Sequence, residues 1–252
     1  MLPVTELHVK FAPNTAPSAP PKGVDLWLLD LTQCSQVSPA NYLKSLPAAD
    51  RVRAQQFSKN QAQFLFTRLF LRNVLAHYTG LATQQIEIER DRNGKPFLAN
   101  TAYPLWFNLS HTQNFAVLAV STLGKVGVDA ETMRKRNILK IAERYFHADE
   151  VRQLKSCTAN EQSTLFFKLW TLKEAFFKAT GGGISTGLDK VHFKIEGKTI
   201  LPTFAPSLKQ SPNDWQLQQF LLHENLFVSL AVETNKPLTS QWFYGNDLPG
   251  LA

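Results

Sequence analysis

Short apolar runs and longer apolar-aromatic stretches alternate along the chain and predict strands and helices in a regular order. Val24 to Leu31 (VDLWLLDL) has the continuous apolar character of a buried strand, and Ala49 to His77 has the spacing of a helix that Gly80 ends. Three short segments rich in β-formers follow, with a turn-like DRNG after the first, and predict strands at 86–90, 105–110 and 115–121. The first half is therefore expected to be a helix over a sheet.

A second round of the same kind begins after the turn at Leu123-Gly124. The pattern predicts a strand in VGVDAE, helices over 138–155 and about 161–180, and further strands in VHFKI, WQLQQFLL and LFVSLAVE. We therefore expect an α+β fold of two similar α/β subdomains, 24–124 and 125–252, joined near residues 122–126. Residues 1–23, which include a proline-rich stretch, are expected to form a flexible leader.

Composition adds a compartment and a kind of partner. The chain has 252 residues, is 44% hydrophobic and carries a formal charge of +7, which indicates an anionic partner without choosing among cofactor, acidic protein and nucleic acid. Cys34 and Cys157 form no CxxC pattern, and a reducing cytoplasm is the simplest location. No signal-peptide pattern opens the chain, and Arg68 and Arg72 interrupt its most apolar stretch, so we expect no membrane association.

Asp129 and Glu131 lie two residues apart in GVDAE. In a strand this spacing places both carboxylates on one face, with Val128 and Ala130 on the other. Two carboxylates on one face supply half of a magnesium site. An acidic solvent-facing side of the strand explains the same spacing, and D-x-E alone favours that simpler interpretation.

Glu174 and Lys178 are four residues apart in the helix KLWTLKEAFFKATGGG, whose other positions are mostly apolar or aromatic. A surface ion pair at this spacing contributes only about 0.2–0.5 kcal/mol. Apolar residues cover nearly the whole circumference, however, so the helix is predicted to be central, and polar groups on it need a partner or a metal. The three glycines at 181–183 are expected to end it.

FNLSH places Asn108, Ser110 and His111 where a predicted strand meets a turn. A lone histidine is more often a structural hydrogen-bonding residue than a catalyst. The order of three polar signatures in hydrophobic settings raises this one above background: FNLSH, then GVDAE, then the aromatic helix with KEA.

In these motifs the sequence resembles the Sfp-type 4'-phosphopantetheinyl transferases. Their signatures GKP, F-N-x-S-H, G-[IV]-D-x-E and W-x-x-K-E-[AS]-x-x-K occur here in family order, at 94–96, 107–111, 127–131 and 170–178. The resemblance spans roughly residues 24 to 232. It implies a monomer of two halves related by pseudo-twofold symmetry, with coenzyme A in the cleft between them.

The resemblance also implies roles for individual residues. Asp129, Glu131 and Glu174 correspond to three Mg²⁺ ligands, in keeping with the preference of this cation for carboxylate oxygens. Lys178 corresponds to a lysine on the transferring phosphate and His111 to a histidine beside the diphosphate, both as catalytic groups. Glu150 is the candidate general base, and a solvated helix residue is an equally good interpretation of it.

Coenzyme A binding is implied for a further group of residues. Arg90 and Lys95 match a cofactor-binding segment, while Arg51 and Arg53 lie in the region that contacts the 3'-phosphate, although a solvated helix face explains these two arginines as well. Asn108, Ser110, His111 and Lys178 complete the expected cofactor contacts.

The expected reaction moves the phosphopantetheine arm of coenzyme A to a serine of an apo acyl or peptidyl carrier protein and releases 3',5'-ADP. The alternative is a non-catalytic relative that binds carrier proteins or nucleic acid, which the positive charge and 11% aromatic content permit. The aromatic residues concentrate in helical core patterns rather than between Lys and Arg, so no nucleic-acid partner is expected. A different magnesium-dependent nucleotide enzyme would carry a P-loop or kinase signature, and the sequence has neither.

Overall fold

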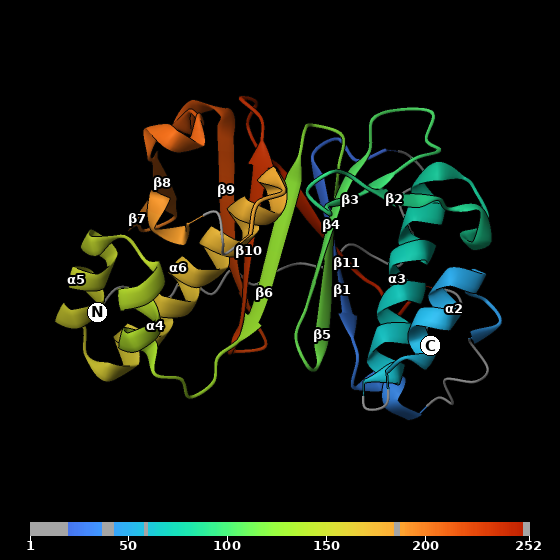
Figure 1. The fold of residues 1–252 in the computed structure, drawn as a ribbon, viewed down its shortest axis with the longest axis horizontal. Helices are drawn as coiled ribbons and strands as arrows, with labels where there is room; N and C mark the ends of the chain where they lie inside the picture. The colour runs from blue at the N-terminus through green and yellow to red at the C-terminus, as the bar shows by residue number, and fades with distance from the viewer. Residues whose placement is uncertain (1–19, 37–42, 58–59, 184–186, 249–252) are drawn as a thin grey trace. The chain divides into compact units, whose positions relative to one another are not determined.

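The structure is a computed structural model that describes residues 20–36, 43–57, 60–183 and 187–248 (Figure 1). Most of the predicted leader, residues 1–19, lies outside this description. The described residues form two compact units, which we call the N-terminal unit (20–122 with 239–248) and the C-terminal unit (123–238). Both mix helices and sheets, so the predicted α+β class is confirmed.

The N-terminal unit contains a four-stranded sheet in the order β11-β1-β5-β4. Its strands are β1 (Val24–Asp30), β4 (Trp106–His111), β5 (Phe115–Ser121) and β11 (Ser240–Tyr244). β11 runs parallel to β1, with Val24 opposite Ser240. The last strand of the described residues therefore belongs to the N-terminal unit, whereas the predicted division placed all of 125–252 in the second subdomain.

Two helices, rather than the single one predicted over 49–77, lie beside this sheet: α2 (Ala48–Gln55) and α3 (Gln61–Thr79). The polar stretch QQFSKN at 55–60 interrupts the apolar spacing between them. Arg72 of α3 is buried and pairs with Asp50 of α2 at 2.7 Å, which fixes one helix to the other. α3 ends where predicted, at Gly80, in the left-handed conformation (φ 70°).

The core of the N-terminal unit lies between α3 and the sheet, where apolar side chains such as Trp27, Phe66 and Phe70 are almost fully buried. A two-stranded hairpin joins this unit after α3. It consists of β2 (Ile88–Arg90) and β3 (Pro96–Leu98), connected by the predicted DRNG turn, in which the Gly94 amide donates to the Asp91 carbonyl.

The C-terminal unit is built around a three-stranded antiparallel sheet in the order β6-β10-β9. Its strands are β6 (Val126–Thr132), β9 (Trp215–Leu222) and β10 (Leu226–Glu233). The long helix α6 (Ala159–Thr180) packs on β6 and β10 and, as predicted, ends at the first glycine of the triplet, Gly181, with φ 76°. Ten of the 22 residues of α6 are buried and only its first three, 159–161, are exposed, so the expectation of a central helix is confirmed.

The region predicted as one helix over 138–155 forms two, α4 (Ile138–Tyr145) and α5 (Ala148–Ser156), because Phe146 and His147 adopt extended backbone conformations between them. A second hairpin consists of β7 (Val191–Glu196) and β8 (Thr199–Phe204). The described residues also include short 3₁₀ helices at Gln33–Gln36, Thr83–Gln85, Leu188–Lys190, Pro206–Leu208 and Pro212–Asp214.

Within the described ranges, every helix is too short or too polar to cross a lipid bilayer.

Candidate functional site

Helix α6 and strand β6 come into close contact at Gly127. A Cβ atom on this glycine would lie 2.0 Å from the Ala175 carbonyl oxygen and 2.4 Å from the Ala179 backbone nitrogen, so only a residue without a side chain allows this packing. Side chains alternate along a strand, and Asp129 and Glu131 therefore share the helix-facing side of β6 with Gly127. The acidic face predicted from D-x-E meets a helix instead of bulk solvent.

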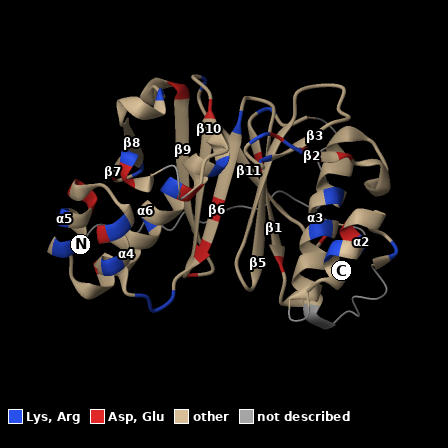
Figure 2. Cartoon of the chain, in the orientation of Figure 1, with Lys and Arg blue, Asp and Glu red and all other residues tan. Residues whose placement is uncertain are grey.

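Residues spaced four apart on α6 face the carboxylates of β6. Trp170, Glu174 and Lys178 follow one stripe of the helix, and Lys178 Nζ lies 2.7 Å from Asp129 Oδ1. The Trp170 side chain lies near enough to Glu131 to act against the rise in the pKa of that carboxyl. The spacing of this tryptophan, glutamate and lysine thus matches the face of α6 that covers β6. Figure 2 shows acidic residues in red along β6 and both signs of charge on α6.

Three carboxylates, those of Asp129, Glu131 and Glu174, are gathered at this contact. Burial raises the pKa of Glu174 from 4.5 to about 7, and the neighbouring Asp129 and Glu131 add to the shift while Lys178 opposes it. Burial also raises the pKa of Glu131, again with a contribution from Asp129. The cluster therefore repels additional negative charge and favours a cation.

Cationic side chains surround the cluster. Besides Lys178 on Asp129, Arg134 and Arg136 reach Glu131 at 3.7 and 3.5 Å. Arg134 is largely exposed, and ion pairs of this kind contribute little free energy in water. Exchange of Arg134 for a bound cation would therefore cost little.

The donor set fits a hard divalent cation. Carboxylate oxygens are the ligands that Mg²⁺ prefers, usually two or three from protein with the remainder from water and phosphate. Glu174 Oε1 is buried and has no hydrogen-bond partner within the described part of the chain, as expected for an oxygen that receives a cation. Asp129, Glu131 and Glu174, named here the carboxylate trio, thus lie near enough to one another for the first two to raise the pKa of the third, and their role as metal ligands stays a prediction.

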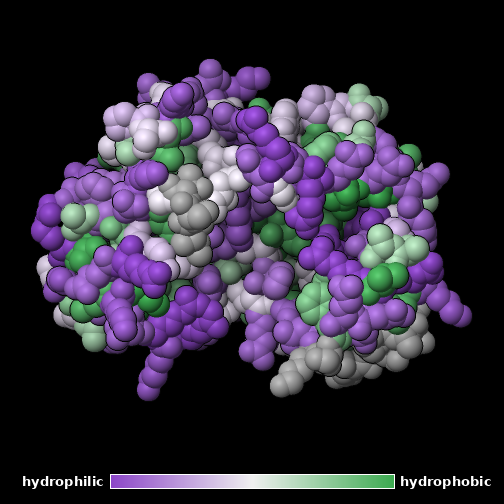
Figure 3. All heavy atoms as spheres, in the orientation of Figure 1, coloured by the Kyte–Doolittle hydropathy of each residue, from purple (hydrophilic) through white to green (hydrophobic). Residues whose placement is uncertain are grey.

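The N-terminal unit carries a separate pocket of about 390 Å³ between α3, the β2–β3 hairpin and β4. Its lining combines basic, amide and apolar side chains: Arg53, Phe57, Asn60, Gln63, Phe64, Thr67, Arg68, Leu71, Arg90, Pro96, Phe107, Asn108, Leu109 and His111. Figure 3 shows hydrophobic surface in green among hydrophilic residues over the α2 and α3 region of this unit. A ligand that combines an aromatic ring with anionic groups would fit this mixed lining.

Electrostatics support an anionic ligand in this pocket. The guanidinium groups of Arg53 and Arg68 lie 5.8 and 5.3 Å from the centre of the Phe64 ring. Burial lowers the pKa of Arg68, and repulsion from Arg53 and Arg90 acts in the same direction. Several positive groups thus converge on one concave surface and would be stabilised by phosphate.

Four of the predicted cofactor residues line this pocket, namely Arg53, Arg90, Asn108 and His111. The other three predicted from this unit, Arg51, Lys95 and Ser110, are not among its lining residues. Sequence reasoning assigned no role to Arg68, Phe64 or Gln63. Their spacing along one face of α3 is a usable signal, but the apolar helix pattern around them points first to a core.

Glu150 is neither a solvated residue nor an accessible base. Its side chain is 0% exposed, and Oε2 lies 2.7 Å from the equally buried Lys173 ammonium. The same carboxylate accepts hydrogen bonds from the backbone amides of His147 and Phe193. A substrate hydroxyl has no path to this group in the structure, so the candidate role of Glu150 as general base is corrected to that of a buried structural carboxylate.

Comparisons with known proteins converge on one family. Residues 125–231 match the 4'-phosphopantetheinyl transferase superfamily, and residues 35–123 match the N-terminal part of 4'-phosphopantetheinyl transferase. The structure of the Thermotoga maritima holo-[acyl-carrier-protein] synthase aligns with 44% of this chain and 64% of that chain at 22% identity, with a TM-score of 0.36.

Three relatives share long aligned regions with this chain. HetI, a 4'-phosphopantetheinyl transferase of Nostoc sp., is 32% identical over 83% of this chain and 87% of its own length. A putative 4'-phosphopantetheinyl transferase of Synechocystis sp. is 39% identical over 60% of this chain and 63% of its own length. The Bacillus pumilus 4'-phosphopantetheinyl transferase is 38% identical, over 62% and 64% respectively. With both halves matched and HetI aligned nearly end to end, the chain belongs to the Sfp-type 4'-phosphopantetheinyl transferase family.

Proposed function

We propose that this protein transfers the phosphopantetheine arm of coenzyme A to a serine hydroxyl of an apo acyl or peptidyl carrier protein. The serine oxygen forms a bond to the β-phosphorus, the bond from that phosphorus to the bridging oxygen breaks, and 3',5'-ADP leaves. The serine proton passes to solvent or a nearby base. The observation that carries the proposal is the carboxylate trio, which lies at the contact of β6 and α6 at the positions of the family motifs, with Asp129 buried and the two glutamates half-buried.

Asp129, Glu131 and Glu174 would hold Mg²⁺. When bound, this cation supplies positive charge to the diphosphate and offsets the charge that develops during phosphoryl transfer. The raised pKa of Glu174 and the unpartnered Glu174 Oε1 support this assignment, because both describe a partly buried carboxylate whose charge the nearby Lys178 compensates only in part.

Lys178 supplies a second positive group at the same contact. Its ammonium is only partly exposed, with 29% of the side chain accessible, and is held by Asp129 in the absence of substrate. A phosphate oxygen would compete for that ammonium, so Lys178 can bind the transferring phosphate while Asp129 turns to the cation.

The pocket of the N-terminal unit is proposed to take the nucleotide part of coenzyme A. Arg53, Arg68 and Arg90 offer charge to its phosphates, and Phe64 offers an aromatic face. Asn108 and His111 complete the polar part of the wall.

An intact-mass assay tests the function. Incubation of an apo carrier protein with coenzyme A, Mg²⁺ and this protein should add one phosphopantetheine group to the carrier. The Asp129→Ala and Glu174→Ala variants should remain folded, as judged by circular dichroism, and lose nearly all transfer. Glu143→Gln, which removes an exposed carboxylate of α4, serves as the control and should retain it. Wild-type turnover in either trio variant would overturn the metal assignment, and an unmodified carrier across a panel of carriers would overturn the function.

A further inference from the structure

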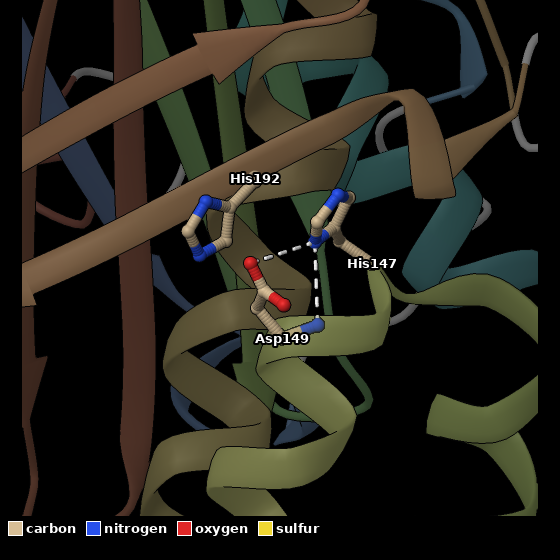
Figure 4. A group of neighbouring side chains, drawn as sticks. All are labelled: His147, Asp149 and His192. Carbon is tan, nitrogen blue, oxygen red and sulfur yellow. Dashed lines mark hydrogen bonds and ion pairs between the residues drawn. The ribbon is translucent and has the colours of Figure 1, made fainter.

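A second group of metal-ligating side chains lies in the C-terminal unit, outside the carboxylate trio. His147 and Asp149 stand at the start of α5, and His192 lies on β7. One ligand atom from each residue lies within 4.8 Å of the other two. Figure 4 shows the Asp149 carboxylate beside the two imidazole rings, with a nitrogen of the His147 ring turned toward it.

The groups present unprotonated donor atoms to one another. His147 Nδ1 accepts a hydrogen bond from the Asp149 backbone amide at 3.3 Å, so this nitrogen is unprotonated, and an ion bound to it would displace that hydrogen bond. It also lies 3.7 Å from Asp149 Oδ2, while Oδ1 of the same carboxylate contacts Arg152. The rings of His147 and His192 stack at 4.9 Å with an interplanar angle of 27°.

The Glu150 carboxylate holds the backbone that carries these ligands. Glu150 Oε2 accepts from the His147 amide at 3.0 Å, and Glu150 Oε1 accepts from the Phe193 amide at 3.0 Å. One buried carboxylate therefore ties the start of α5 to β7 next to each histidine, and Lys173 holds that carboxylate in place. Ligands on two segments fixed in this way lose little conformational entropy when they bind an ion.

We propose that His147, Asp149 and His192 form a binding site for a divalent transition-metal ion of the zinc class. Two imidazole nitrogens and one carboxylate oxygen are a usual three-ligand set for Zn²⁺, with water in the remaining position. Mg²⁺ favours oxygen donors alone, so the carboxylate trio and this site select different ions. The bound ion would bridge α5 and β7 and stabilise the C-terminal unit. This inference goes beyond the proposed transferase function and does not depend on it.

A simpler interpretation of the same contacts needs no metal. In it, His147 caps the N-terminus of α5, Asp149 complements the helix dipole, and the two histidine rings only stack. The two interpretations differ in zinc affinity. Untagged protein is stripped of metal and then saturated with Mg²⁺, so that the carboxylate trio is occupied. Zn²⁺ is titrated into this protein in competition with a chromophoric chelator. The melting temperature is recorded with and without Zn²⁺.

The wild type should bind one Zn²⁺ tightly and melt at a higher temperature when loaded. His192→Gln and Asp149→Asn should each weaken that binding on the order of tenfold or more, because each removes one of three ligands. Asp149 is 45% exposed, so its variant tests the site without a core change. His223→Asn is the matched control, because it removes a histidine at a turn position with φ 48° that asparagine tolerates, and it should bind Zn²⁺ as the wild type does.

Equal zinc affinity in the wild type and both ligand variants would overturn the proposal. Loss of the tight zinc in Glu174→Gln, with retention in His192→Gln, would also overturn it, because the ion would then occupy the carboxylate trio.

Discussion

The Lys178 ammonium lies 2.7 Å from Asp129 Oδ1, so a lysine of α6 occupies an oxygen that the family motif assigns to a metal ion. Asp129 is almost fully buried, and a buried carboxylate needs a positive partner in every state of the enzyme. Lys178 provides that partner when no cation is bound. On the proposed function, the same residue would become available to a phosphate oxygen when a cation replaces it.

This exchange predicts a split effect for Lys178→Gln. Transfer should slow by about 100-fold, because a positive group at the phosphate is lost. The Mg²⁺ concentration that gives half-maximal rate should stay the same or fall, because the variant removes a competitor for Asp129. Steady-state kinetics across a Mg²⁺ titration measure both quantities. Lys155→Gln, on the exposed side of α5, is the control. A rise in the Mg²⁺ requirement together with the slower rate would contradict the exchange.

Glu174 predicts a pH dependence of stability in metal-free protein. Its pKa is about 7 in the folded state against an ordinary 4.5, so the folded protein holds the proton more tightly than the unfolded chain does. Stability should therefore fall as pH rises from about 4.5 to about 7. Glu174→Gln lacks this titration, so its stability relative to the wild type should increase across that interval and then level off. Urea unfolding in EDTA at several pH values tests this, and a difference that is constant with pH would be inconsistent with a raised pKa.

Local periodicity located two polar faces in the sequence, one with Asp129 and Glu131 and one with Glu174 and Lys178, and the family resemblance joined three of these residues into the carboxylate trio. A spacing of two residues in a strand, or of four in a helix, places side chains on one face, and both faces were predicted. The sequence did not reveal that β6 turns its acidic face to α6, since that depends on the contact of Gly127 with Ala175, a residue distant in the chain. Glu150 was misjudged for the same reason, because its burial depends on Lys173 and on the Phe193 amide. β11 joins β1 across more than two hundred residues, and no local pattern specifies such a pairing.

The pocket predicts a selective loss of coenzyme A affinity in Arg53→Ala. One charge-assisted hydrogen bond contributes about 1.5–3 kcal/mol, so the Kd for coenzyme A should rise by roughly 10-fold or more. If Arg53 contacts the 3'-phosphate, the Kd for 3'-dephospho-coenzyme A should change little. Calorimetric titration of both ligands measures the difference. Arg51→Ala serves as the matched control, because Arg51 lies on the same helix but is not part of the pocket lining. Equal losses for the two ligands would assign Arg53 to another part of the cofactor.

Gly127→Ala should be destabilising out of proportion to its size. The new methyl group would sit 2.0 Å from the Ala175 carbonyl oxygen, which belongs to the backbone and cannot rotate away. Overpacking of this kind costs about 1–3 kcal/mol, and the displaced α6 should also carry Glu174 away from Asp129 and reduce transfer. Chemical unfolding and the mass assay measure the two effects. Gly183→Ala, where an added Cβ would meet no atom within 4 Å, should leave both nearly unchanged.

The buried pair of Lys173 and Glu150 predicts a strongly non-additive mutant cycle. Both side chains are 0% exposed, and Lys173 also donates to the Leu188 carbonyl at 2.9 Å, so removal of one charge leaves the other buried without compensation. Lys173→Met and Glu150→Gln should each cost about 3–5 kcal/mol, and the double variant should cost clearly less than the sum. The exposed pair of Lys194 and Glu196, 64% and 52% accessible, provides the control cycle, for which each change should cost at most about 1 kcal/mol. Purely additive losses at Lys173 and Glu150 would mean that the two residues stabilise the C-terminal unit through separate contacts. In that case Glu150 would hold the backbone at His147 and Phe193 without help from Lys173.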